Sequence, residues 1–184
     1  VLWRLWPLWM ATVFLFVGYQ TFLSFAPIFF TTLTGNTSRM GLVMFASGLV
    51  HGVTAMRFGR LADQYQRETL LRLVCLGFVA CMATYTLNPH PLIVIAAFLP
   101  PIWMAFDVSA TSLVADRLPY RLRGRGVGIL NSCMFLGAGS GALLGGALRH
   151  SMSFEQVFGA GTLMVTFGFL IAIYATRSTE IPRA

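Results

Sequence analysis

Residues 127–148 read VGILNSCMFLGAGSGALLGGAL, an apolar run bounded by Arg125 and Arg149. A bilayer core of about 30 Å needs roughly 20 apolar helical residues, so this run predicts a transmembrane helix. The whole chain of 184 residues is 57% hydrophobic and only 10% charged, against about 25% charged residues in ordinary soluble domains. This composition excludes a soluble globular domain, a disordered chain and a disulfide scaffold.

Five further apolar runs have a similar length. They cover residues of about 5–33, 40–56, 70–87, 92–115 and 154–176, with short polar breaks between them. Backbone groups in hydrocarbon must pair within their own segment, so continuous runs of this kind predict helices rather than alternating strands. The sequence therefore predicts one all-α domain over residues 1–184, a polytopic bundle of six transmembrane helices.

The formal net charge is +7, and all 13 basic residues are arginines. Cytoplasmic loops of membrane proteins are rich in basic residues. With the N-terminus inside, the outer loops hold only Arg39 and Arg149. The other eleven then lie inside: Arg4, Arg57, Arg60, Arg67, Arg72, Arg117, Arg121, Arg123, Arg125, Arg177 and Arg183. We therefore expect both termini in the cytoplasm of a bacterial-type inner (plasma) membrane, with the lipid bilayer and not nucleic acid as partner.

The break after the second run reads GRLADQYQR over residues 59–67. It resembles the loop Gly-x-x-x-Asp-x-x-Gly-Arg of the major facilitator superfamily of secondary transporters, which lies between the second and third helix of each six-helix half. Gly59, Asp63 and Arg67 match this pattern, whereas Gln66 stands in place of a glycine that would free the backbone. The resemblance implies that these three residues form a gating loop.

The same resemblance implies a missing partner, because members of the family usually have twelve helices in two similar halves. The six runs, the absence of an initiator Met and the short tail lead us to expect a C-terminal half that joins another six-helix half. An N-terminal half stays open. So does a self-associating six-helix channel or assembly protein without transport chemistry of its own.

Small residues recur in the fifth run, where Gly137, Gly141 and Gly145 fall on one helix face. Such a face lets two helix backbones approach closely in lipid. We therefore predict a helix-packing seam there. A static seam and a sliding surface are both open, and the resemblance favours the second.

Two ionisable residues stand out within the predicted spans, namely His51 near the middle of the second run and Asp107 in the fourth. Charged groups are costly in hydrocarbon, so each is a candidate for function, here for proton coupling. The alternatives are a hydrogen-bonded packing role for His51 and a structural ion pair of Asp107 with Arg57.

The resemblance implies that the first, second, fourth and fifth helices line a central cavity. The candidate substrate-binding residues on these helices are Phe16, Tyr19, Gln20, Ser24, Trp103, Asn131 and Phe135. Aromatic walls with few polar anchors are typical of small-molecule sites. The expected substrate is a small, lipophilic molecule, and both efflux and uptake are possible.

Enzymatic motifs are absent from the sequence. Ser140 lies among glycines, but residues 151–184 contain no His to serve as its base. The three cysteines form no metal-type pair, and no phosphate-binding or dinucleotide fingerprint occurs. We therefore predict a secondary active transporter, or half of one, that works by alternating access and is not an enzyme. It is expected to need no cofactor and no metal.

Overall fold

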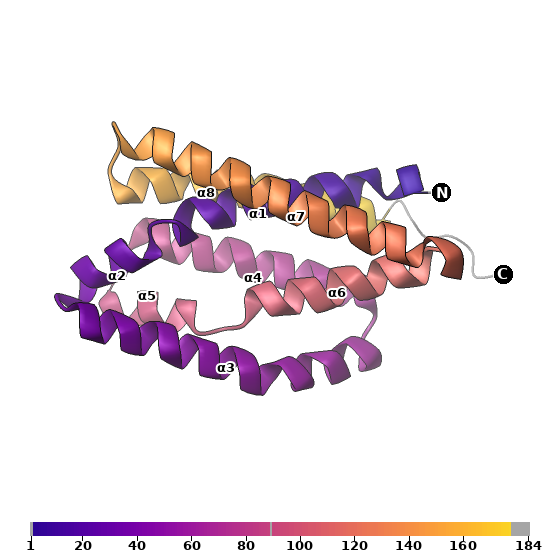
Figure 1. Ribbon diagram of the computed structural model, residues 1–184, viewed down its shortest axis with the longest axis horizontal. Helices are drawn as coiled ribbons and strands as arrows, with labels where there is room; N and C mark the ends of the chain where they lie inside the picture. The colour runs from indigo at the N-terminus through magenta and orange to yellow at the C-terminus, as the bar shows by residue number, and fades with distance from the viewer. Residues whose placement is uncertain (1, 89, 178–184) are drawn as a thin grey trace.

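The computed structural model describes residues 2–88 and 90–177, apart from the side chains at positions 55–56, 61–63 and 177. This part of the chain contains helices and no strand, so the all-α prediction is confirmed. The helices run roughly along one common axis (Figure 1). They are η1 Leu2–Leu5, α1 Trp6–Leu23, α2 Ala26–Thr34, α3 Thr37–Gln64, α4 Arg67–Leu87, α5 Pro91–Phe98, α6 Ile102–Arg117, α7 Tyr120–Arg149 and α8 Phe154–Arg177.

Two of the predicted runs are interrupted. The first is divided into α1 and α2 at Ser24, and the fourth into α5 and α6 at residues 99–101. In each run a proline lies near the start of the second helix: Pro27 is in the first turn of α2, and Pro101 directly precedes α6. Proline has no N–H and its ring displaces the preceding helical turn, so it interrupts a helix inside an otherwise apolar run.

Five helical stretches in the described part of the chain are long and apolar enough to cross a membrane. They are Leu2–Leu23, Arg67–Leu87, Pro91–Arg117, Tyr120–Arg149 and Phe154–Thr176. The second predicted run falls in α3, which continues from Thr37 to Gln64 and ends eight residues later than expected. The polytopic membrane architecture is thus confirmed, and the count of six spans is matched approximately.

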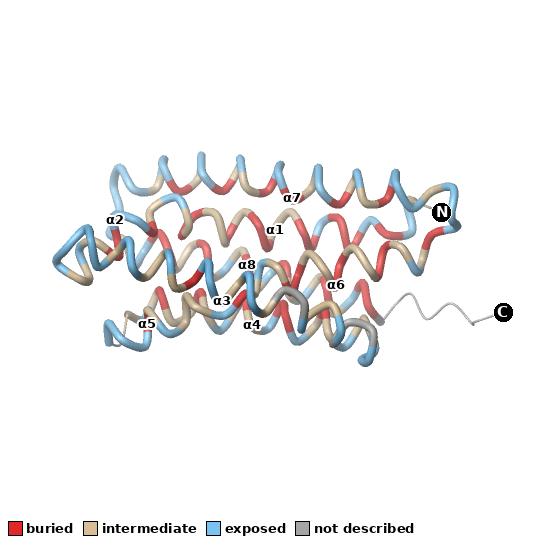
Figure 2. Tube along the Cα trace, turned by 60° about the horizontal axis from the view of Figure 1, so that its bottom comes forward, coloured by how far each residue is buried: buried red, intermediate tan, exposed pale blue. Residues whose placement is uncertain are grey.

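Helix α1 lies between α7 and α8 and also contacts α4. It is buried on several sides, which is visible as red along its trace in Figure 2, and its apolar residues accordingly follow no single stripe. Helix α8 also packs on α4, and α6 lies against α4 and α7. The core is aromatic: Phe22 stacks on Tyr85 with ring centroids 3.9 Å apart and meets Phe158 at 5.1 Å.

The glycine face of α7 lies against α1. Gly137, Gly141 and Gly145 are all buried, and a Cβ on Gly137 would lie 2.6 Å from the carbonyl oxygen of Val13. A Cβ on Gly145 would lie 3.3 Å from the Cα of Thr21. Only glycine permits so close an approach of two backbones, and so these positions let α7 pack directly on α1.

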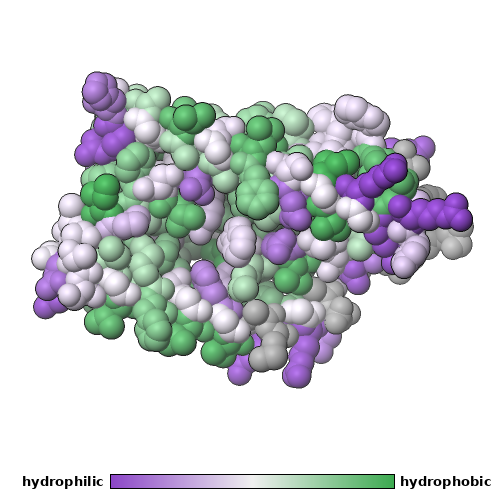
Figure 3. Space-filling model, viewed as in Figure 1, coloured by the Kyte–Doolittle hydropathy of each residue, from purple (hydrophilic) through white to green (hydrophobic). Residues whose placement is uncertain are grey.

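The outer surface carries many apolar side chains, as expected of a bundle that faces lipid or another membrane helix. Exposed examples include Phe45 on α3, Phe135 on α7 and Phe167 on α8. Figure 3 shows one such face, on which hydrophilic side chains concentrate toward the ends with a few in the middle. The first described helix begins, and the last described helix finishes, at the same end of the bundle (Figure 1).

Candidate functional site

The break between α5 and α6 leaves two carbonyl oxygens without helical donors. The carbonyl of Ala97 would accept from residue 101, which is a proline and has no N–H. The carbonyl of Phe98 would accept from Ile102, but the N–H of Ile102 donates instead to the carbonyl of Pro100 at 2.8 Å. Since orphaned carbonyls are costly away from water, other side chains must supply donors.

Neighbouring helices supply these donors. The hydroxyl of Tyr85 and the thiol of Cys81, both on α4, donate to the carbonyl of Ala97 at 3.0 and 3.2 Å. The hydroxyl of Ser47 on α3 donates to the carbonyl of Phe98 at 3.3 Å. The break is therefore held by side chains of α3 and α4.

His51 lies next to this break. Its Nε2 is 3.4 Å from the Oγ of Ser47, one helical turn earlier on α3. Because the Ser47 hydroxyl donates to Phe98, its lone pair can accept a hydrogen bond from Nε2 of His51 when that nitrogen carries the hydrogen. The ring is half-buried and lies beside the hydroxyl that supports the break.

A small cavity of about 30 Å³ adjoins His51, Tyr19 and Trp103. Three of the predicted site residues, from α3, α1 and α6, are thus brought together. The volume suits about one water molecule and is far below the 300–1,000 Å³ of sites for drug-sized ligands. The cavity therefore cannot enclose such a molecule within this chain.

Asp107 is half-buried on α6, one turn after Trp103. The hydroxyl of Thr111 donates to its Oδ1 at 3.4 Å. The alternative ion pair with Arg57 does not form among the described residues, where Arg57 is exposed and Asp107 has no cationic partner.

The remaining predicted substrate residues do not form one surface. Phe16 is only 4% exposed, packs on Phe106 with centroids 5.5 Å apart and so belongs to the core, not to a cavity wall. Gln20 is half-buried and donates to Ser24 at 3.4 Å. The spacing of four correctly groups Phe16 and Gln20 on one helix face, but their Cβ atoms lie at the seam that α7 covers.

Asn131 and Phe135 lie on α7 outside its glycine seam. Both are exposed, and Phe135 retains 78% of its accessible surface. They therefore face out of this chain. Trp103 is also exposed, at 42%. A site formed by these three residues must therefore be completed by something outside this chain.

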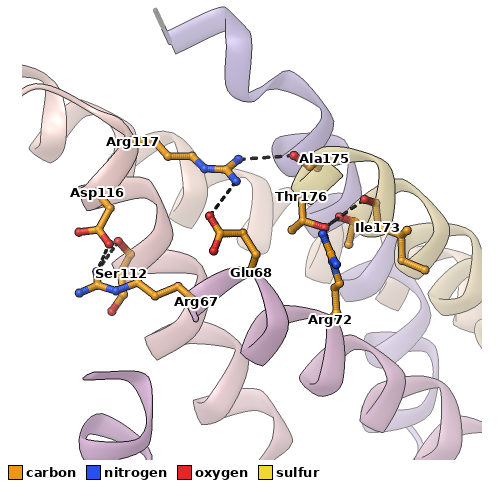
Figure 4. Close-up of polar contacts among 10 residues, drawn as sticks. Arg67, Glu68, Arg72, Ser112, Asp116, Arg117, Ile173, Ala175 and Thr176 are labelled. Atoms are coloured by element: carbon orange, nitrogen blue, oxygen red, sulfur yellow. Dashed lines mark hydrogen bonds and ion pairs between the residues drawn. The ribbon is translucent and has the colours of Figure 1, made fainter. Parts of the chain in front are cut away.

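Two crossed ion pairs join the beginning of α4 to the end of α6 (Figure 4). Nη1 of Arg67 lies 2.8 Å from Oδ2 of Asp116 and also donates to the carbonyl of Ser112 at 2.8 Å. Nη2 of Arg117 donates to Oε1 of Glu68 at 3.2 Å. Adjacent residues on one helix thus bind adjacent residues on the other, which fixes both the distance and the rotation between the two helices.

The same cluster holds the last turn of α8. Arg117 also donates to the carbonyl of Ala175 at 3.4 Å, and the Nε of Arg72 donates to Thr176 Oγ1 at 2.6 Å (Figure 4). Cations that bind the last carbonyls of a helix are favoured by its dipole. Sequence reasoning counted Arg72 and Arg117 only as orientation signals and did not predict these contacts.

The predicted gating loop differs from the expectation. Helix α3 continues to Gln64, so the break is reduced to residues 65–66. Gly59 lies inside this helix, and no neighbour lies within 4 Å of where its Cβ would be, so it makes no close approach. The Asp63 side chain lies outside the described residues, and Arg67 takes part in the ion pair with Asp116.

No cluster of three or more His, Cys, Asp or Glu side chains occurs in the described part of the chain. What the structure offers instead is an apolar helical bundle with a broken helix and ion pairs at one end. These features define a multi-pass membrane protein. The sequence model of the Major Facilitator Superfamily matches residues 8–184, and the chain belongs to this family.

The relatives that the chain resembles carry names that refer to multidrug resistance. The chain is 27% identical over 157 residues to the multi-drug resistance efflux pump PmrA of Streptococcus pneumoniae, which covers 81% of this chain and 38% of the relative. It is 28% identical over 144 residues to the multidrug resistance protein MdtG of Dickeya zeae, covering 77% and 35%. It is 22% identical over 186 residues to MdtG of Proteus mirabilis, covering 97% and 46%. The chain thus spans less than half the length of these relatives.

Proposed function

We propose that this chain forms one half of a proton-coupled secondary transporter that exports small lipophilic molecules by alternating access. The family membership and the names of the relatives support a transporter and favour efflux. The observation that carries the proposal is the contact of His51 with Ser47, which holds the open carbonyl at the α5–α6 break. A titratable group there links a proton to the shape of a membrane helix.

Protonation of His51 would change the hydrogen bonding and the charge beside the α5–α6 break. A neutral His51 imidazole accepts at Nδ1, whereas the imidazolium donates at both nitrogens and adds a charge beside the break. That charge is expensive in a low-dielectric region unless water or another polar group moves toward it. We infer that α5 and α6 change their relative angle as His51 gains or loses its proton, with Asp107 on α6 as a second proton carrier.

Helix α6 connects this event to the proposed cytoplasmic end. Its last residues, Asp116 and Arg117, form the crossed ion pairs with Arg67 and Glu68. A tilt of α6 at the break would strain or release these pairs. We propose that they close the cytoplasmic side in the outward-open state, together with the gating residues Gly59 and Asp63.

The substrate is expected to lie on the open face of the chain. The enclosed cavity of about 30 Å³ is too small for it, and Trp103, Asn131 and Phe135 are exposed. A second six-helix half would cover this face and complete a wet, partly aromatic site. Transport would therefore need both halves, with both termini in the cytoplasm.

Transport in membrane vesicles with an imposed pH gradient tests the proposal, with ethidium as the lipophilic fluorescent substrate. We expect His51→Gln to reduce gradient-driven ethidium transport by about tenfold or more while substrate binding persists, because the amide is polar but does not titrate. His150→Gln, at the exposed turn before α8, is the matched control and should transport normally.

Asp107→Asn and Asp63→Asn separate the proposed proton coupling from the proposed gating. The first should reduce the dependence of transport on the gradient, whereas the second should slow transport without abolishing binding. If His51→Gln and Asp107→Asn both keep full gradient-driven transport, proton coupling through these residues is wrong. Unchanged kinetics in Asp63→Asn would reject the gating role alone.

A further inference from the structure

Helix α5 begins directly after an exposed histidine, His90, whose side chain caps it. Nδ1 of the imidazole accepts the backbone N–H of Leu92 at 3.3 Å. His90 has the extended backbone that is usual for an N-cap residue. An imidazole that accepts at Nδ1 must be neutral and carry its hydrogen on Nε2. The cap therefore exists in only one protonation state of this side chain.

The first turn of α5 depends on His90 for its N-terminal hydrogen bonds. A helix start leaves its first N–H groups without acceptors inside the helix. Here Pro91 has no N–H, and the N–H groups of Ile93 and Val94 donate to the carbonyl of His90 at 3.0 and 3.1 Å. The N–H of Leu92 is left with the imidazole as its only acceptor among the described residues.

Packing adds little support to this turn. Leu92 and Ile93 are 70% and 52% exposed, and Val94 is the first residue of α5 that is fully buried. The next support from another helix comes at Ala97, whose carbonyl accepts from side chains of α4. Since α5 has eight residues, or about two helical turns, its beginning lies close to the α5–α6 break.

The His90 ring is open to water. It forms no ion pair with a described residue, and its only hydrogen bond in the described part of the chain is the one with Leu92. Helix α5 itself has no ionisable side chain. Solvent protons can therefore reach the ring directly. The ionisable groups on the elements around it are Cys81 and Tyr85 on α4, Arg39 and His51 on α3, Arg149 and His150 at the end of α7, and Glu155 on α8.

We propose that His90 is a pH-sensitive cap, which loosens the first turn of α5 in acid. The imidazolium has hydrogens on both nitrogens and cannot accept the N–H of Leu92. Its charge is also unfavourable beside the positive end of a helix. On the proposed orientation this turn faces the outer side of the membrane. Acid there weakens the start of α5, whereas His51 lies next to the break at the other end.

Hydrogen–deuterium exchange of the purified full-length protein in detergent tests the proposal. Mass spectrometry follows the amide protection of residues 92–98 at about pH 5.5 and about pH 7.5, on either side of the range in which histidine ordinarily changes charge. Labelling times are scaled to the intrinsic exchange rate at each pH. Every measurement is repeated in a His51→Gln background, so that titration at the break cannot produce the change.

We expect the parent protein to be about fivefold less protected at the lower pH, which is the size of effect usual for the loss of an N-cap. His90→Asn should stay protected at both pH values, because its amide oxygen caps a helix and does not titrate. His90→Ala should be weakly protected at both. His90→Asp, a cap that stays ionised in this range, should behave like His90→Asn and replaces it if that variant does not fold.

His150→Asn is the matched control at an exposed histidine outside α5, and it should keep the response of the parent. Protection that does not change with pH in the parent would overturn the proposal. An equal change in His90→Asn, or a response that His51→Gln or His150→Asn removes, would overturn it as well. The assay needs neither substrate nor gradient, so its failure leaves the transport proposal standing, and a failure of transport leaves the cap.

Discussion

Gly137 of α7 lies directly against the backbone of α1. A methyl group there would lie 2.6 Å from the carbonyl oxygen of Val13 and 2.8 Å from the Cβ of Phe16. Carbon–oxygen contacts of this kind are normally about 3.3 Å or longer, so the methyl would overlap by about 0.7 Å. Neither neighbour is the end of a flexible side chain, and therefore the helices themselves must move apart.

We expect Gly137→Ala to lower the free energy of unfolding by about 1–3 kcal/mol, which is the usual cost of overpacking. The better helix propensity of alanine, at most about 1 kcal/mol, offsets part of this loss. Thermal unfolding of the purified protein in one detergent, followed by circular dichroism, measures the effect. A loss of 1 kcal/mol corresponds to a decrease in Tm of about 2–4 °C for a chain of this size.

Gly139→Ala is the matched control on the same helix. Gly139 is exposed, and no neighbour lies within 4 Å of where its Cβ would be. This variant should therefore be as stable as the parent or more so. A Gly137→Ala protein that unfolds at the same temperature as Gly139→Ala would refute the close packing of α7 on α1.

Four further predictions concern polar contacts, all measured by the same unfolding assay. Arg117→Gln should cost about 1–3 kcal/mol because a 10% exposed guanidinium loses bonds to α4 and α8. Arg67→Gln should cost about 1 kcal/mol or less, since its ion pair is half-exposed, and equal losses would contradict this ranking. Ser47→Ala should cost about 1–2 kcal/mol by orphaning a carbonyl at the break, with the exposed Ser132→Ala as a near-neutral control. Tyr85→Phe should cost less than Ser47→Ala, because a thiol still donates to the same carbonyl, and a larger loss would show otherwise.

The two helical breaks cannot be recognised from the hydropathy of an apolar run. Pro27 and Pro101 are plain in the sequence, yet hydropathy sums the side chains and ignores the missing N–H groups. Both interrupted runs were therefore predicted as single spans. The donors that repair the second break, Ser47 and Tyr85, lie about 50 and 12 residues from the carbonyls they bind, and no local pattern pairs them.

The candidate site was predictable in part for the same reason. His51 and Trp103 stood out as polar or aromatic groups within apolar runs, and they do adjoin one cavity with Tyr19. Phe16 shares the helix face of Gln20 but is covered by α7. Periodicity tells which residues share a face, whereas only packing tells what lies against that face.

The sequence by itself determined that this is an all-α, multi-pass membrane protein of the Major Facilitator Superfamily. Span length and apolarity are local properties that each segment carries alone. The tertiary structure decided that α1 lies between α7 and α8 and that Arg117 holds both α4 and α8. These are contacts between distant segments, and their energies depend on how close two helices come, which the glycines of α7 permit but do not specify.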